Sequence, residues 1–185
     1  MVIYVVTGTP GVGKTSVINE AIKDKSLKVV VFGDVMFELA RESGLVKSKD
    51  EMRSVLSLET YKQLQEKTAE KIASMSGDIV VDTHASTKRV DGYFPGLPEW
   101  VLKKLNPKVI VVIEARPSEI ELRRKDDLTR QRADFGGADQ VIEYQNINRA
   151  FVAAYSALSG CLVKIITNEQ GKLIEAAQKL REVFK

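Results

Sequence analysis

Residues 8–15 read Gly8-Thr9-Pro10-Gly11-Val12-Gly13-Lys14-Thr15, which fits the pattern G-x-x-x-x-G-K-[ST] of a phosphate-binding loop. The apolar, β-branched run at residues 2–6 comes directly before it and predicts a buried parallel strand. Apolar residues then recur at helical spacing from Val17 to Ile22. Because this order of strand, glycine loop and helix is the context that the pattern requires, we prefer a phosphate site to a glycine-rich turn with an accidental lysine.

The loop residues have separate expected roles. Its glycines allow positive φ angles and let the backbone approach an anion closely. Backbone N–H groups and the following helix N-terminus then surround the phosphates. Lys14 is expected to reach the β- and γ-phosphates, and the Thr15 hydroxyl is expected to bind Mg²⁺.

Five apolar, β-branched runs are separated by helical patterns, which predicts an α/β fold with a parallel sheet covered by helices on both faces. The runs lie at residues 2–6, 28–32, 78–81, 108–113 and 162–166. With 185 residues, the chain is expected to form a single domain, residues 1–185, in a three-layer P-loop fold. In such sheets ligands bind beyond the carboxyl ends of the strands, so the loops there should converge on one site.

Composition excludes several classes of protein. The net charge of +3 gives no reason to expect a nucleic-acid partner, and no apolar run is long enough to span a bilayer. One cysteine, Cys161, excludes an internal disulfide and a cysteine-rich zinc site. Since Met1 leads directly into the first strand, without a targeting peptide, we expect a cytoplasmic protein.

Two aspartates follow predicted strands. Asp82 ends the third run. This position is typical of a Walker B carboxylate, which holds Mg²⁺ directly or through water. The alternative is an aspartate that caps a helix or forms a turn. Asp34 follows Gly33 after the second run. It can cap the next helix, contact a ligand, or do both.

Residues 50–75 carry an apolar stripe at helical spacing and predict one long helix, with Arg53 beside the stripe. Residues 83–98 and 125–138 are irregular, and long irregular segments of a compact domain often form lids or binding loops. Five cations fall within residues 123–132, namely Arg123, Arg124, Lys125, Arg130 and Arg132. They are either a solvated helix face or, as we prefer, ligands of phosphate oxygens.

The chain resembles the archaeal-type adenylate kinases nearly from end to end. Three segments carry most of the resemblance: Asp82-Thr83-His84, Gly92-Tyr93-Phe94-Pro95-Gly96-Leu97-Pro98 and Asp127-Leu128-Thr129-Arg130-Gln131-Arg132. Four shorter segments add to it, at residues 33–36, 50–53, 148–150 and 163–168. One stretch departs from the family, because Arg89-Val90-Asp91 stands where Thr-Pro often precedes the Gly-Tyr pair.

The resemblance implies reversible, Mg²⁺-dependent phosphoryl transfer from ATP to AMP, giving two ADP. It implies that residues from Gly8 to Ser16 bind the ATP phosphates and that Lys14, Arg123, Arg130 and Arg132 are catalytic. On the AMP side it implies Asp34, Arg53 and a second cation, either Arg89 or its neighbour Lys88. It also implies an AMP-side region at about residues 34–75 and a short lid at about 125–138. Because members of this family are often trimers, the resemblance favours a homotrimer.

Two alternatives remain open at this stage. The chain can be a P-loop kinase for another small acceptor, such as a nucleoside, shikimate or a different nucleoside monophosphate. It can also be a slow ATPase that acts as a switch or assembly factor, in which the γ-phosphate orders and releases a loop.

Overall fold

The computed structural model describes residues 1–184 except residues 50, 90 and 127–136, and leaves the side chains of residues 53 and 126 undescribed. The strands are β1 (Ile3–Gly8), β2 (Lys28–Val31), β3 (Ile79–Asp82), β4 (Ser86–Arg89), β5 (Gly92–Pro95), β6 (Val109–Glu114) and β7 (Leu162–Thr167). The helices are α1 (Lys14–Ile22), α2 (Phe32–Glu42), α3 (Glu51–Ser54), α4 (Leu58–Ala73), α5 (Glu99–Leu105), α6 (Pro117–Asp126), α7 (Ala138–Ser159) and α8 (Leu173–Arg181).

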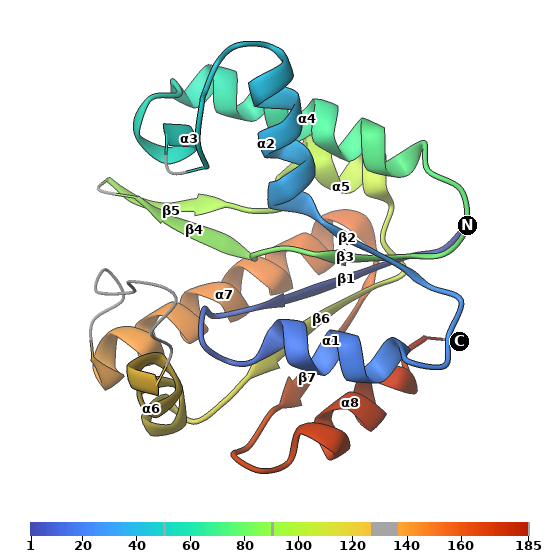
Figure 1. Ribbon diagram of the computed structural model, residues 1–185, viewed down its shortest axis with the longest axis vertical. Coiled ribbons are helices and arrows are strands. Elements are labelled where there is room, and N and C mark those ends of the chain that lie inside the picture. Colours follow the sequence, from blue (N-terminus) through green and yellow to red (C-terminus); the bar gives the residue numbers. More distant parts are fainter. Residues whose placement is uncertain (50, 90, 127–136, 185) are drawn as a thin grey trace.

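The main sheet has five parallel strands in the order β2-β3-β1-β6-β7 (Figure 1). This confirms the predicted fold and shows that all five apolar runs form strands. β1 lies in the middle, paired with β3 through Val6 and Asp82 and with β6 through Gly8 and Ile113. The loop after β1 and the end of β3 are therefore neighbours, which brings the phosphate-loop residues close to Asp82.

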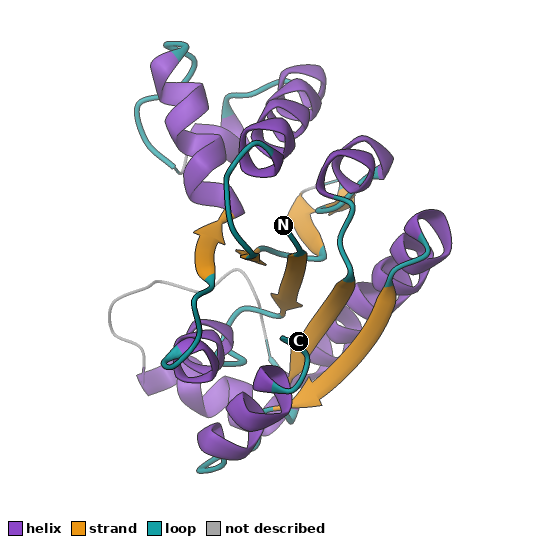
Figure 2. Cartoon of the chain, turned by 90° about the vertical axis from the view of Figure 1, so that its right-hand side faces the viewer, coloured by secondary structure: helices purple, strands orange, loops and turns teal. Residues whose placement is uncertain are grey.

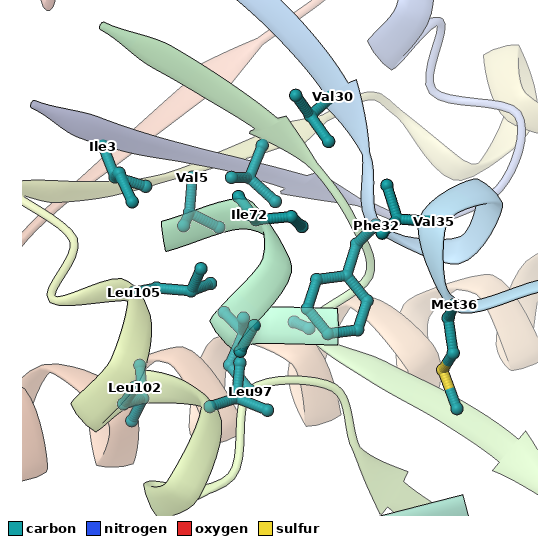
Figure 3. Close-up of a cluster of buried hydrophobic side chains, with 14 of the residues drawn as sticks. Ile3, Val5, Val30, Phe32, Val35, Met36, Ile72, Leu97, Leu102 and Leu105 are labelled. Carbon is teal, nitrogen blue, oxygen red and sulfur yellow. The ribbon is translucent and has the colours of Figure 1, made fainter. Parts of the chain in front are cut away.

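Helices cover both faces of the sheet, as Figure 2 shows. Alternate residues of β1 enter two cores, because successive side chains of a strand point to opposite faces. Ile3 and Val5 pack with α2, α4, α5 and part of α7, and Figure 3 shows part of this cluster. Tyr4 and Val6 pack with α1, α6 and α8 on the other face.

Three local predictions are wrong. Phe32 begins α2 instead of ending β2; it is buried in the core, and an apolar run alone does not separate a strand end from a buried helix start. The predicted helix at residues 50–75 is two helices. Ser57 has extended backbone, with ψ of 155°, and its hydroxyl accepts a hydrogen bond from the Thr60 N–H at 3.1 Å, so it caps α4.

The interval at residues 83–98 contains the third difference, an antiparallel hairpin of β4 and β5. Its strands have four residues each, too short to give an alternating pattern that stands out from a glycine- and proline-rich loop. Among the described residues, no helix is both long and apolar enough to cross a bilayer. Most of the predicted lid lies outside the described residues.

Candidate phosphoryl-transfer site

The phosphate loop connects β1 directly to α1. Gly13 takes a left-handed conformation with φ of 82°, and a Cβ there would lie 2.7 Å from the Asn168 amide nitrogen. Only glycine meets both conditions without strain. The loop then enters α1 at Lys14, so the helix N-terminus and its unpaired N–H groups face the end of the sheet.

Three side chains from α6 and from the end of β7 hold the loop from outside. Asn168, just after β7, donates to the Val12 carbonyl oxygen at 2.7 Å, and Arg123 donates to the same oxygen at 3.1 Å. Arg124 donates to the Pro10 carbonyl oxygen at 2.7 and 3.0 Å. Because these donors bind loop carbonyls from outside, they fix the peptide planes and favour a single loop conformation.

A buried polar chain links the loop to the hairpin. The side-chain amide of Asn148, on α7, donates to the Thr9 hydroxyl at 3.3 Å, and the Ser86 hydroxyl of β4 donates to the Asn148 Oδ1 atom at 2.7 Å. All three side chains are buried. The sequence did not predict a role for Asn148 or Asn168, since an isolated asparagine carries no pattern.

Lys14 and Asp82 meet in the centre of the site. The Lys14 ammonium forms an ion pair with the Asp82 carboxylate and donates to the Thr83 carbonyl oxygen at 2.5 Å. Burial lowers the pKa of Lys14 below its ordinary value, and the Asp82 carboxylate opposes that shift. A buried ammonium and carboxylate at a strand end form a polar centre that suits a phosphate and its counter-ion.

A cavity of about 220 Å³ opens beside this pair. Lys14, Asp82, Thr83 and His84 form one part of its wall. The remaining lining residues from α2 to the hairpin include Phe32, Gly33, Asp34, Met36, Lys49, Met52, Tyr61, Gln65, Thr87 and Gly96. A Cβ on Gly96 would overlap the His84 carbonyl oxygen, so glycine lets the end of the hairpin close against the cavity wall.

Asp34 lines this cavity but does not cap α2. It is the third residue of the helix, whose N-cap is Val31, and its carboxylate accepts from the Lys49 ammonium at 2.7 Å. The capping interpretation is therefore wrong. Both side chains are more than half exposed, so the pair itself contributes little to stability.

The predicted arginines fall into three groups. Arg123 contacts the phosphate loop, as does Arg124, to which the family resemblance assigns no role. The Arg89 guanidinium lies over the rings of Tyr61 and Phe94, at 4.6 and 5.5 Å from their centroids. The side chain of Arg53, and all of Arg130 and Arg132, lie outside the described residues.

Tyr61 and Gln65 were not predicted as cavity residues, because the apolar stripe of α4 is typical of a core helix. One signal was available: Gln65 is a polar residue one turn after Tyr61, on the side of the helix that carries the apolar stripe. Thr15 and Ser16 are exposed in the first turn of α1, which leaves their hydroxyls open to a ligand.

Comparison with known proteins identifies the family. An adenylate kinase of Thermoplasma acidophilum is 48% identical over 180 residues, which cover 97% of each chain. The chain belongs to the adenylate kinase family. An adenylate kinase of Methanocaldococcus jannaschii is 45% identical over 99% of this chain and 98% of its own. A family model described as an AAA domain matches residues 7–139.

Solved structures agree on the fold. A shikimate kinase from Bacteroides thetaiotaomicron superimposes with a TM-score of 0.65, covering 99% of this chain and 98% of its own. A shikimate kinase from Acinetobacter baumannii gives a TM-score of 0.57, covering 98% and 91%. These chains are 13% and 15% identical to this one, so they establish a shared P-loop kinase fold and nothing about the acceptor.

Proposed function

We propose that the chain catalyses reversible transfer of the γ-phosphoryl group of Mg·ATP to AMP, giving two ADP. The observation that carries this proposal is the position of the cavity: it begins at Lys14 and Asp82, where the phosphate loop ends, and continues between α2, α4 and the hairpin. A donor phosphate chain on the loop and an acceptor phosphate in the cavity would meet at Lys14.

The donor side uses residues from Gly8 to Ser16. The loop N–H groups and the helix N-terminus bind the phosphates of ATP, and Lys14 neutralises charge on the transferred group. Because Asn168, Arg123 and Arg124 already hold the loop carbonyls, little reorganisation accompanies binding.

Mg²⁺ would reach this site with ATP. Mg²⁺ is usually held by one or two carboxylates together with substrate phosphates. The exposed Thr15 hydroxyl and the Asp82 carboxylate at the end of β3 fit that donor set. In the described part of the chain, no three acidic, histidine or cysteine side chains lie together as a metal site. A metal that shares its ligands with the nucleotide does not need such a group. When bound, the ion would neutralise phosphate charge.

On the acceptor side, we assign AMP contacts to Asp34, Arg53 and Arg89, within a region at about residues 34–75 and the adjoining hairpin. Asp34 lines the cavity, and Arg53 follows Met52, which also lines it. Nε and Nη2 of Arg89 are buried without a hydrogen-bond partner among the described residues, so this guanidinium keeps donors available to an anion.

In the reaction an oxygen of the AMP phosphate forms a bond to the γ-phosphorus. The bond between that phosphorus and the β–γ bridging oxygen breaks, and the oxygen stays on ADP. A phosphate monoester has a second pKa near 6, so the acceptor is already ionised at neutral pH and needs no general base. The work left to the protein is alignment and neutralisation of charge.

We assign the remaining catalytic charges to Arg123, Arg130 and Arg132, and the lid to residues at about 125–138. A lid that closes over the phosphates would exclude water and so suppress hydrolysis of ATP. We also propose a homotrimer and a cytoplasmic location. The homotrimer rests on the family resemblance, and the cytoplasmic location rests on composition alone.

A scan of acceptors tests the proposal. Purified protein would be incubated with Mg·ATP and, separately, AMP, shikimate, adenosine or no acceptor, and ADP would be measured by chromatography. We expect two ADP for each AMP consumed and little ADP without an acceptor. Turnover with shikimate or adenosine but none with AMP would overturn the proposal, and equal ADP formation without any acceptor would favour the slow ATPase.

A further inference from the structure

A buried hydrogen-bonded link joins the phosphate loop to the hairpin that forms one wall of the cavity. Its members, here called the asparagine link, are Thr9 of the loop, Asn148 of α7 and Ser86, the first residue of β4. Their exposed fractions lie between 0 and 3%. Buried polar groups that all have partners form rigid connections, because breaking one leaves a polar atom without water or a substitute for it.

The two ends of the asparagine link lie on the two sides of the proposed reaction. Thr9 belongs to the loop that is proposed to hold the donor phosphates. At the other end, Ser86 opens β4, its neighbour Thr87 lines the cavity, and Gly96 at the end of the hairpin lines it too. Asn148 therefore connects the donor loop to a wall of the acceptor cavity.

The helix that carries Asn148 is fixed to the sheet by other side chains. Just after β6, the Ala115 N–H donates to Oε1 of Gln145 at 3.3 Å. At the end of β6, the Glu114 carboxylate accepts from Nε of Arg149 at 2.7 Å. Because these bonds do not involve Asn148, a change of Asn148 should leave α7 in place and act on the asparagine link.

The hairpin is held to α7 by two tyrosine hydroxyls. Tyr144 donates to the Ser86 carbonyl oxygen at 2.6 Å, and Tyr155 donates to the Ala85 carbonyl oxygen at 2.7 Å (Figure 1). Helix and hairpin therefore form one frame, and Asn148 extends from this frame to the phosphate loop. The separation of frame and loop is also the separation of the cavity wall and the donor phosphates.

We propose that Asn148 is a positioning residue for phosphoryl transfer, which sets the separation between the phosphate loop and the hairpin and so aligns the γ-phosphoryl group with the acceptor phosphate. It acts through Thr9 and Ser86 and touches neither nucleotide. This inference rests on the proposed function. Transfer depends steeply on alignment, and a misplacement of about 1 Å can cost about 100-fold in rate. A residue that fixes the alignment should affect turnover more than the binding of either nucleotide.

The test separates alignment from binding and from stability. For the full-length protein we would measure kcat, the KM for ATP and for AMP, thermal unfolding, and the calorimetric affinity for an analogue in which two adenosines are joined by five phosphates. The proteins are the wild type, Asn148→Ala, Ser86→Ala, the double variant, and Gln145→Ala as a matched control. Gln145 is also a buried amide of α7, but it binds the backbone after β6.

In Asn148→Ala we expect kcat to fall about tenfold, while the KM for ATP and for AMP each change less than about threefold. The affinity for the analogue should fall about tenfold, because only a ligand that spans both sides senses their separation. Ser86→Ala should give the same pattern, and the double variant should add little, since both changes break one link. Gln145→Ala should lower the unfolding temperature and leave kcat within about twofold of the wild type.

Unchanged kcat and analogue affinity in Asn148→Ala would overturn the inference, as would an equal loss of kcat in Gln145→Ala. Independent, additive effects of Asn148→Ala and Ser86→Ala would also contradict it. If Asn148→Ala does not fold, the comparison of Ser86→Ala with Gln145→Ala decides alone. A wild type that does not phosphorylate AMP would refute the proposed function and the inference with it, so the two failures are distinguishable.

Discussion

The proposed donor side and the proposed acceptor side of this site are built in different ways. The phosphate loop is one continuous segment between β1 and α1, and it offers mainly backbone N–H groups to a ligand. The cavity proposed for the acceptor is assembled from α2, α3, α4, the end of β3 and the hairpin, which span residues 31–96. A contiguous backbone site leaves a sequence motif, whereas a cavity made from distant side chains leaves almost none.

The two sides also differ in how they are held. Donors from α6, α7 and the end of β7 bind the phosphate loop from outside. The acceptor side is held mainly by apolar packing around Tyr61 and by single hydrogen bonds such as that from Gln65 to Pro95. Changes on the donor side should therefore affect the chemical step, and changes on the acceptor side should affect which ligand binds and how tightly.

The largest expected effect is that of Lys14→Met, which removes the charge shared by both sides. We expect kcat to fall about 1000-fold, the upper range for removal of one electrostatic stabiliser, with the fold retained. ADP formation and thermal unfolding would be measured beside Lys23→Met, a control at the exposed end of α1. Activity within a few-fold of wild type would refute the role of Lys14.

Arg130→Ala and Arg132→Ala should each lower kcat about 100-fold, with a smaller effect on KM, because these charges should act chiefly in the transition state. The two residues stand two apart, so in an extended segment their side chains would point the same way and reach one phosphate chain. Arg116→Ala is a suitable control. Arg116 is exposed just before α6, and its one ion pair with a described residue is with Glu169. If both variants keep the kcat of the control, the basic segment is ordinary surface.

A smaller effect is expected for Asp82→Asn, on the order of tenfold in turnover at saturating Mg²⁺. Asparagine keeps the shape but loses the charge that pairs with Lys14 and is proposed to hold Mg²⁺. Titration of Mg²⁺ at fixed ATP should show a higher requirement than in the wild type. Unchanged requirement and turnover would make Asp82 a structural residue.

The smallest effect is expected from Ser57→Ala, which removes the N-cap of α4 and not a ligand contact. Loss of such a cap costs about 1 kcal/mol of stability. Urea unfolding should show this loss, while the KM for ATP stays the same. A large change in the KM for ATP would contradict the separation of the two sides.

The sequence alone predicted the sheet and the phosphate loop because both depend on short-range patterns: runs of β-branched residues, and glycines with a lysine at fixed spacing. It also placed Asp82 at the end of a strand next to the loop, as the pairing of Val6 with Asp82 confirms. The family assignment from the loop and lid segments is confirmed by the curated relatives.

Features that depend on tertiary contacts were not predicted. The break at Ser57 interrupts a continuous apolar stripe, so spacing alone favoured one helix. Gln65 lines the cavity, and its amide donates to the Pro95 carbonyl oxygen of the hairpin, 30 residues further along the chain. Arg124 was predicted, with the other cations of its segment, to bind phosphate oxygens, whereas the fold places its guanidinium on the Pro10 carbonyl oxygen.

We propose that the donor and acceptor sides form one continuous site that meets at Lys14. The most direct measurement is calorimetric titration with an analogue in which two adenosines are joined by five phosphates, since it spans both sides. We predict one analogue bound per chain, far more tightly than ATP or AMP alone, and loss of both ATP and AMP binding in its presence. An affinity no higher than that of ATP, with AMP still able to bind, would contradict the account.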